Sequence, residues 1–270
     1  MEKTHDLIRV LKYFFLYLFI ATLAVPMLLY LLVYLMESIV WGHETSLEAL
    51  MNNSMIDDAS LILGNFCLIV LFIKKKYTSL NWAEKPWTQI GKQKNLYLWA
   101  ILLELASILP INLLVVWLNL SDYSTALDTD STLTLGSVIG IVCFAPLAEE
   151  LVMRGAIEEK LLQAKRSAGV AIGLSAFLFA ILHVYPSLMI NAFLCGLVTG
   201  WVYYRTRNVL LCVAMHITAN GLSCLIDWMQ PGNPISEFAH ETRIIFLALF
   251  SLVFMVYSIS QLKKLTGLKD

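Results

Sequence analysis

Long apolar runs separated by short polar connections dominate the hydrophobic pattern of this 270-residue chain. A helix that crosses a bilayer needs about 20 predominantly apolar residues. Eight runs reach or approach that length, and we expect a helix in each of them: residues 12–36, 59–73, 96–120, 134–157, 168–184, 187–204, 208–227 and 243–262. The pattern therefore predicts an all-α, polytopic membrane protein with eight transmembrane helices.

The charges in the connections provide a test of this helix count. Lys and Arg collect in the cytoplasmic loops of membrane proteins. Basic clusters lie before the first run and after the second, fourth, sixth and eighth runs. The alternate connections are acidic and carry almost no basic residue. This alternation is expected of eight helices with both termini in the cytoplasm.

Composition supports the membrane interpretation. Hydrophobic residues make up 59% of the chain and charged residues 14%, whereas a soluble domain carries about 25% charged residues. The formal net charge of −1, with basic residues scattered among the connections, gives no reason to expect nucleic acid as a partner. The expected partners are the lipid bilayer and a membrane-associated polypeptide, and the expected location is the cell membrane, as a multi-pass protein of a bacterial plasma membrane. The oligomeric state is left open.

Two carboxylates and a guanidinium interrupt the fourth apolar run. Glu149, Glu150 and Arg154 follow a stretch without charged residues, and ionisable groups at membrane depth are costly and usually functional. Glu150 and Arg154 are spaced i,i+4 with the acid first, which favours an ion pair. Glu149 is rotated by about 100° from Glu150 on a helix, so we expect it to point elsewhere and to be the functional carboxylate. Pro146, one turn earlier, lacks an N–H and is expected to kink this run.

Two further pairs of side chains share a helix face. Phe179 and His183 are spaced i,i+4 at the end of the fifth run, and His216 and Asn220 have the same spacing in the seventh. Taken alone, His183 is typical of a histidine at a helix end. His216 with Asn220 could equally be a polar pair that joins helices.

Together, one Glu and two His from three helices form the minimum set for activating a water molecule. Glu149, His183 and His216 could bind zinc and leave one position open for hydroxide. Alternatively, Glu149 could act as general base on a water oriented by His183. His216 and Asn220 would then donate hydrogen bonds to the oxyanion. The residues alone leave both chemistries open.

In this order and spacing, the three motifs resemble the signature of the CPBP intramembrane proteases, which include the Rce1-like CAAX prenyl endopeptidases and the bacterial Abi proteins. The resemblance covers roughly residues 134–226. It implies a CAAX-protease-like bundle that cleaves a membrane-associated polypeptide, either prenylated or of a bacteriocin or leader type. No cofactor is favoured, and zinc is the alternative. The resemblance implies a catalytic set of Glu149, His183, His216 and Asn220, supported by Glu150, Arg154, Phe179 and Asn191.

This interpretation divides the chain into three regions and leaves alternatives of other classes. Residues 1–130 would form three N-terminal helices, residues 131–230 the catalytic core, and residues 231–270 an external loop and the last helix. A non-proteolytic scaffold or regulator, for example of a sensor kinase or of bacteriocin immunity, could use the same fold. A transporter with a proton relay is a third option, but it predicts internal repeats, and none is visible in the sequence.

The predicted helix boundaries raise a conflict of depth. At 1.5 Å per residue, His183 would lie about 24 Å and His216 about 12 Å from the cytoplasmic edge. Helix tilt, a break at Pro146, or a fifth helix that begins deeper would bring the two side chains together. Glu104, Asn65 and Asn112 are weaker candidates, expected to line a cavity or to form hydrogen bonds between helices.

Overall fold

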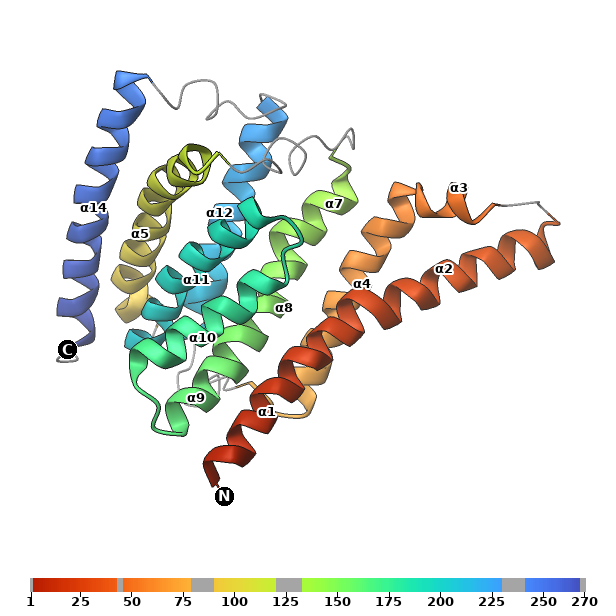
Figure 1. Cartoon of the computed structure of the whole chain (residues 1–270), viewed down its shortest axis with the longest axis horizontal. Coiled ribbons are helices and arrows are strands. Elements are labelled where there is room, and N and C mark those ends of the chain that lie inside the picture. Colours follow the sequence, from red (N-terminus) through yellow and green to blue (C-terminus); the bar gives the residue numbers. More distant parts are fainter. Residues whose placement is uncertain (1, 43–45, 79–89, 120–132, 230–240, 268–270) are drawn as a thin grey trace.

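The computed structural model describes residues 2–42, 46–78, 90–119, 133–229 and 241–267, which contain helices and connections but no strand. This confirms the all-α prediction for the described part of the chain. Figure 1 shows the helices packed side by side, with α1 beginning and α14 ending at the same end of the bundle. Trp82, Pro86 and Trp87 lie among lysines in the connection 74–95, a pattern typical either of an interfacial segment or of an ordinary loop, and these three residues lie outside the described part of the chain.

The helices follow the predicted order along the chain. Those of the N-terminal part are α1 (Glu2–Tyr17), π-helix η1 (Leu18–Ala24), α2 (Val25–Leu35), π-helix η2 (Met36–Val40), α3 (Leu47–Met51), α4 (Ser54–Lys74) and α5 (Ile90–Trp117). Those that follow are α7 (Leu135–Ile139), π-helix η4 (Gly140–Phe144), α8 (Ala145–Val152), π-helix η5 (Met153–Glu158), α9 (Glu159–Gln163), α10 (Ala168–Ile181), α11 (Pro186–Thr206), α12 (Val209–Met229) and α14 (Thr242–Thr266).

Seven helical segments in the described part of the chain are long and apolar enough to cross a membrane. They are Asp6–Val40, Ser54–Lys74, Gln93–Trp117, Leu135–Gln163, Pro186–Thr206, Val209–Met229 and Thr242–Thr266. The fifth predicted run forms α10, which has only 14 residues. Pro186 restricts the residue before it to extended backbone, and Tyr185 is extended, with φ −90° and ψ 131°. Helices therefore form at all eight predicted positions, but seven rather than eight have the length of a span.

The fourth predicted run is one continuous helical stretch with two π-helices in it. α8 lies between η4 and η5, and the stretch continues through α9 to Gln163. At the end of η4, the N–H of Ala145 donates to Gly140 O, five residues earlier. Pro146 has no N–H to make the next such bond, so the carbonyl of Ile141 lacks this backbone donor. The break expected at Pro146 therefore takes the form of a π-turn after which one carbonyl lacks its backbone donor.

The segment α8–η5 lies in the middle of the bundle (Figure 1), with α1 and α4 on one side and α10, α11 and α12 on the other. Its apolar side chains, Ala148, Leu151, Val152, Met153, Ala156 and Ile157, are almost fully buried. They form the largest apolar cluster together with residues of α1, α4, α10 and α11. By contrast, no residue of α2 is buried. The motif with the two glutamates is thus held by a segment that is enclosed by other helices on both sides.

Gly155 in η5 allows a close approach of the chain at Thr78. A Cβ added at Gly155 would overlap Thr78 Oγ1 and lie 3.2 Å from Thr78 Cβ and 3.5 Å from Val209 Cγ2. We therefore expect Gly155→Ala to lower the free energy of unfolding by about 1–3 kcal/mol, the usual cost of overpacking. Chemical denaturation of the purified variant in detergent measures this change.

Gly173 in α10 supplies the matched control, because a Cβ there would have nothing within 4 Å. Gly173→Ala is expected to leave stability unchanged or to raise it by up to about 1 kcal/mol, as for an open helical position. A Gly155→Ala protein as stable as the Gly173→Ala protein would contradict the close contact at Thr78.

Candidate active site

Arg154 links the motif helix to its neighbours. It is fully buried, and its Nε lies 3.2 Å from Glu150 Oε2, which confirms the ion pair predicted from the i,i+4 spacing. Its Nη2 donates to Gly196 O at 3.3 Å and to Thr199 Oγ1, both on α11. The guanidinium also lies 5.3 Å from the centre of the Phe179 ring on α10. One side chain thus fixes η5 against α8, α10 and α11.

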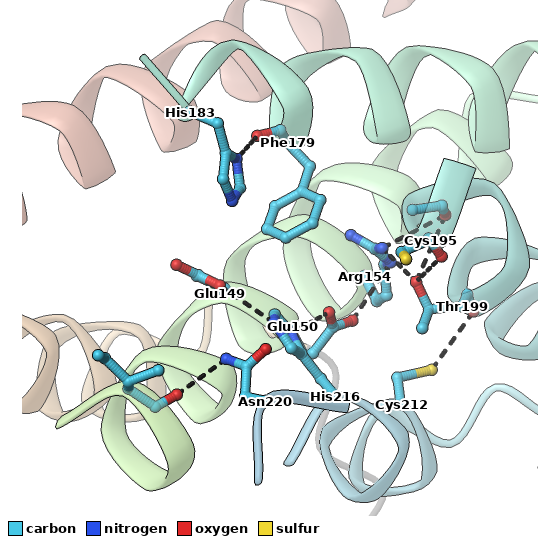
Figure 2. A network of polar contacts seen from close by, with 12 residues as sticks. Glu149, Glu150, Arg154, Phe179, His183, Cys195, Thr199, Cys212, His216 and Asn220 are labelled. Atoms are coloured by element: carbon cyan, nitrogen blue, oxygen red, sulfur yellow. Dashed lines mark hydrogen bonds and ion pairs between the residues drawn. The ribbon is translucent and has the colours of Figure 1, made fainter. Parts of the chain in front are cut away.

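His216 of α12 lies between the two adjacent carboxylates (Figure 2). Its Nδ1 donates to Glu150 Oε1 at 3.0 Å, and its Nε2 lies 3.7 Å from Glu149 Oε2. The first contact is a hydrogen bond that orients the imidazole, whereas the second is too long for a direct one. Glu150 therefore positions both Arg154 and His216.

Glu149 differs from Glu150 in its access to solvent and in its partners. The Glu149 side chain is 15% exposed, against 1% for Glu150. Its Oε1 accepts a hydrogen bond at 3.0 Å from the hydroxyl of Tyr17, at the end of α1. The expectation that Glu150 binds Arg154 while Glu149 points elsewhere is confirmed. The contact with Tyr17 was not predicted, since nothing in the first apolar run distinguishes this tyrosine.

Phe179 and His183 lie at the end of α10 and face the same site. The Phe179 ring makes edge contacts with both histidines, with centroids 5.1 Å from His183 and 5.7 Å from His216. His183 Nδ1 lies 3.2 Å from Phe179 O. A carbonyl only accepts, so this nitrogen carries a hydrogen, and in a neutral imidazole Nε2 is then the acceptor. The two histidines thus meet through one aromatic ring, and the predicted conflict of depth does not arise.

Asn220 fills the gap in hydrogen bonding that Pro146 creates. Its Nδ2 donates to Ile141 O at 2.9 Å, the carbonyl left without a backbone donor at the end of η4. Figure 2 shows Asn220 beside His216 on α12. One of its two amide hydrogens is therefore engaged by the protein, and the second is left for another acceptor.

The other polar residues named from the sequence form hydrogen bonds between or within helices, or are buried near Arg154. Asn191 Nδ2 donates to Asn112 Oδ1 at 3.3 Å and joins α11 to α5, while Asn65 donates to Leu61 O within α4. Glu104 and Glu158 are buried carboxyl groups that interact electrostatically with Arg154. Glu158 was not predicted as a site residue, although its position four residues after Arg154 places it on the same helix face.

Zinc, the alternative cofactor considered from the sequence, would be held by Glu149, His183 and His216. Within the described ranges, no group of three or more His, Cys, Asp or Glu residues is placed so that it could hold a metal ion. The Nδ1 atoms of His183 and His216 are both engaged by protein acceptors, and His216 Nε2 faces Glu149. These contacts leave Nε2 of each histidine as the nitrogen through which a metal would bind, so the choice between zinc and metal-free catalysis stays a prediction.

Comparison with protein families gave a match to one family and no other relative. Residues 131–222 match the Rce1-like family, described as type II CAAX prenyl endopeptidase Rce1-like. The matched segment, about a third of the chain, runs from just before α7 into α12 and includes all three motifs. No curated protein and no solved structure matched the chain. The family resemblance inferred from the motifs is thus confirmed: residues 131–222 of this multi-pass membrane protein match the Rce1-like family.

Proposed function

We propose that the chain is an intramembrane endopeptidase that hydrolyses a peptide bond in a membrane-associated polypeptide with a water molecule activated by Glu149. The convergence of the three motifs carries this proposal. His216 lies between Glu149 and Glu150, and Phe179 lies between His183 and His216. Of the two carboxylates, Glu149 is the one that reaches accessible space.

In the proposed reaction, Glu149 acts as general base and His183 orients the water. The lone pair on His183 Nε2 accepts one hydrogen of the water molecule, since Nδ1 donates to Phe179 O. Glu149 accepts the proton from the other O–H bond as the water oxygen attacks the scissile carbonyl carbon. A positioned base of this kind contributes about 10²–10⁴-fold to the rate.

His216 and Asn220 would stabilise the negative charge that develops on the carbonyl oxygen. His216 Nδ1 donates to Glu150. When His216 is protonated, its Nε2–H can therefore donate to the carbonyl oxygen of the substrate. Asn220 has the amide hydrogen not used by Ile141 O. Donors fixed in advance at the position of the oxyanion are an efficient source of rate enhancement. When the tetrahedral intermediate collapses, the C–N bond breaks and the leaving nitrogen takes the proton from Glu149.

The family match and the membrane location support a lipid-anchored substrate. The matched family is named for the CAAX prenyl endopeptidases, and a CAAX sequence carries its prenyl group on the cysteine. A polypeptide with such a lipid anchor would bring a peptide bond to a site built within membrane helices. Glu150 and Arg154 would act by holding His216 and η5 in place.

The experiment uses the purified full chain in lipid nanodiscs and a farnesylated peptide that ends in a CAAX sequence. Mass spectrometry is expected to show release of the C-terminal tripeptide, at a rate that EDTA does not change. Loss of activity in EDTA and recovery with zinc would overturn the metal-free mechanism. If neither this peptide nor unprenylated membrane peptides were cleaved, the non-proteolytic scaffold would be the better description.

A further inference from the structure

Tyr17 brings a helix from outside the matched family segment into contact with the proposed base. Its hydroxyl donates to Glu149 Oε1 at 3.0 Å, across 132 positions of sequence. The family match begins at residue 131, so it does not cover α1. Tyr17 is only 6% exposed, which keeps solvent from competing for this hydrogen bond.

Packing of α1 holds the Tyr17 ring in place. Val10, Tyr13, Phe14 and Tyr17 form one buried face of α1 and pack in the same apolar cluster as α8 and η5. π-helix η1 begins at the next residue, and none of its residues is buried. π-helices are rare and are often found at functional sites. The buried face of this helix thus ends at Tyr17, with its hydroxyl on the motif glutamate.

The hydrogen bond gives the two oxygens of Glu149 different roles. The terminal torsion of a glutamate side chain is broad, so a carboxylate without a partner presents either oxygen. Here Oε1 is occupied by Tyr17, whereas Oε2 faces His216 Nε2 at 3.7 Å. At this separation the two atoms make no direct hydrogen bond, so Oε2 stays available to the attacking water.

We propose that Tyr17 is a positioning residue that commits Oε2 of Glu149 to act as the base; this rests on the proposed function. One O–H bond of the water breaks and its proton moves to Oε2. The water oxygen bonds to the carbonyl carbon, and the carbonyl electron pair moves to the carbonyl oxygen. Tyr17 keeps its own proton throughout. The N-terminal region thereby belongs to the working site rather than serving only as a membrane anchor.

Tyr17→Phe tests this role, because it removes the hydroxyl and keeps the ring that packs in the core. With the farnesylated CAAX peptide and nanodisc-embedded full chain, we expect kcat to fall by about 10- to 100-fold, as for a misplaced catalytic group. KM should stay within about twofold, because Tyr17 does not bind substrate. The matched control is Tyr30→Phe. Tyr30 lies in the same long helical segment as Tyr17, and its hydroxyl donates to Asp57. It should leave kcat unchanged.

A double substitution separates positioning from a structural role. If Tyr17 acts through Glu149, adding Tyr17→Phe to Glu149→Gln should cause no further loss of the residual activity. An equal loss in both backgrounds, or an unchanged kcat in Tyr17→Phe alone, would overturn the proposal.

Infrared spectroscopy gives a readout that does not depend on hydrolysis. The carboxyl band that disappears in Glu149→Gln should shift in Tyr17→Phe and stay in place in Tyr30→Phe. If the band shifts but the wild type hydrolyses no peptide, the contact is only structural, and the proposed function and the role of Tyr17 both fall. If the wild type hydrolyses the peptide and depends on Glu149, while Tyr17→Phe keeps full kcat, only the role of Tyr17 falls.

Discussion

Replacing Glu149 with Gln is expected to lower kcat by about 10²–10⁴-fold, the usual contribution of a general base. The amide has the size of the carboxylate and keeps an oxygen that can accept the hydrogen bond from Tyr17. It cannot take a proton from water. Single-turnover cleavage of the farnesylated peptide, with protein level and unfolding measured in parallel, separates this loss from misfolding.

Glu159→Gln is the matched control for this substitution. Glu159 lies ten positions further along the same helical stretch and pairs with Arg207 at 2.7 Å. It should retain the wild-type kcat. A Glu149→Gln protein that is as active as the Glu159→Gln protein would show that Glu149 is architectural and would remove the basis of the proposed mechanism.

Arg154→Met is expected to have the largest effect on stability, lowering the free energy of unfolding by about 3–5 kcal/mol. Removing one partner of a buried ion pair leaves the other charge uncompensated, and here Glu150 would remain inside the bundle. Gly196 O and Thr199 Oγ1 would also lose their contact with the guanidinium. Chemical denaturation in detergent, followed by tryptophan fluorescence, measures this loss.

Arg207→Met provides the comparison, since Arg207 pairs with Glu159 while its side chain is 41% exposed. A partly exposed ion pair contributes about 0–1 kcal/mol, so this variant should unfold close to the wild type. If the two substitutions lowered the free energy of unfolding equally, burial of the Arg154–Glu150 pair would not explain its contribution to stability.

The pattern of apolar runs was sufficient to place the helices, because a membrane span is set mainly by the length of an apolar stretch. The exception, α10, shows what the pattern leaves out. The apolar run continues to Val184, yet the helix ends at Ile181. Pro186 excludes a helix that continues through Tyr185, but neither it nor the hydropathy of residues 182–184 indicates an end as early as Ile181.

The site was only partly predictable for a different reason. Spacing of i,i+4 determines which side chains share a helix face, so the Glu150–Arg154 pair followed directly from the sequence. Contacts between helices depend on how the helices pack. The hydrogen bond from Tyr17 to Glu149 therefore has no signal in the local sequence. For the hydrogen bond from Asn220 to Ile141, the only signal in the sequence is Pro146, which has no N–H.

The shortness of α10 also bears on the lipid that surrounds the protein. Its 14 residues extend about 21 Å at 1.5 Å per residue, against a hydrocarbon thickness of about 30 Å. Acyl chains next to a short helix must tilt or compress, which thins the bilayer locally. The thinnest hydrocarbon would then lie beside the turn that carries His183. A polypeptide in the headgroup layer would then cross less hydrocarbon to reach this turn than a bilayer of unperturbed thickness would require.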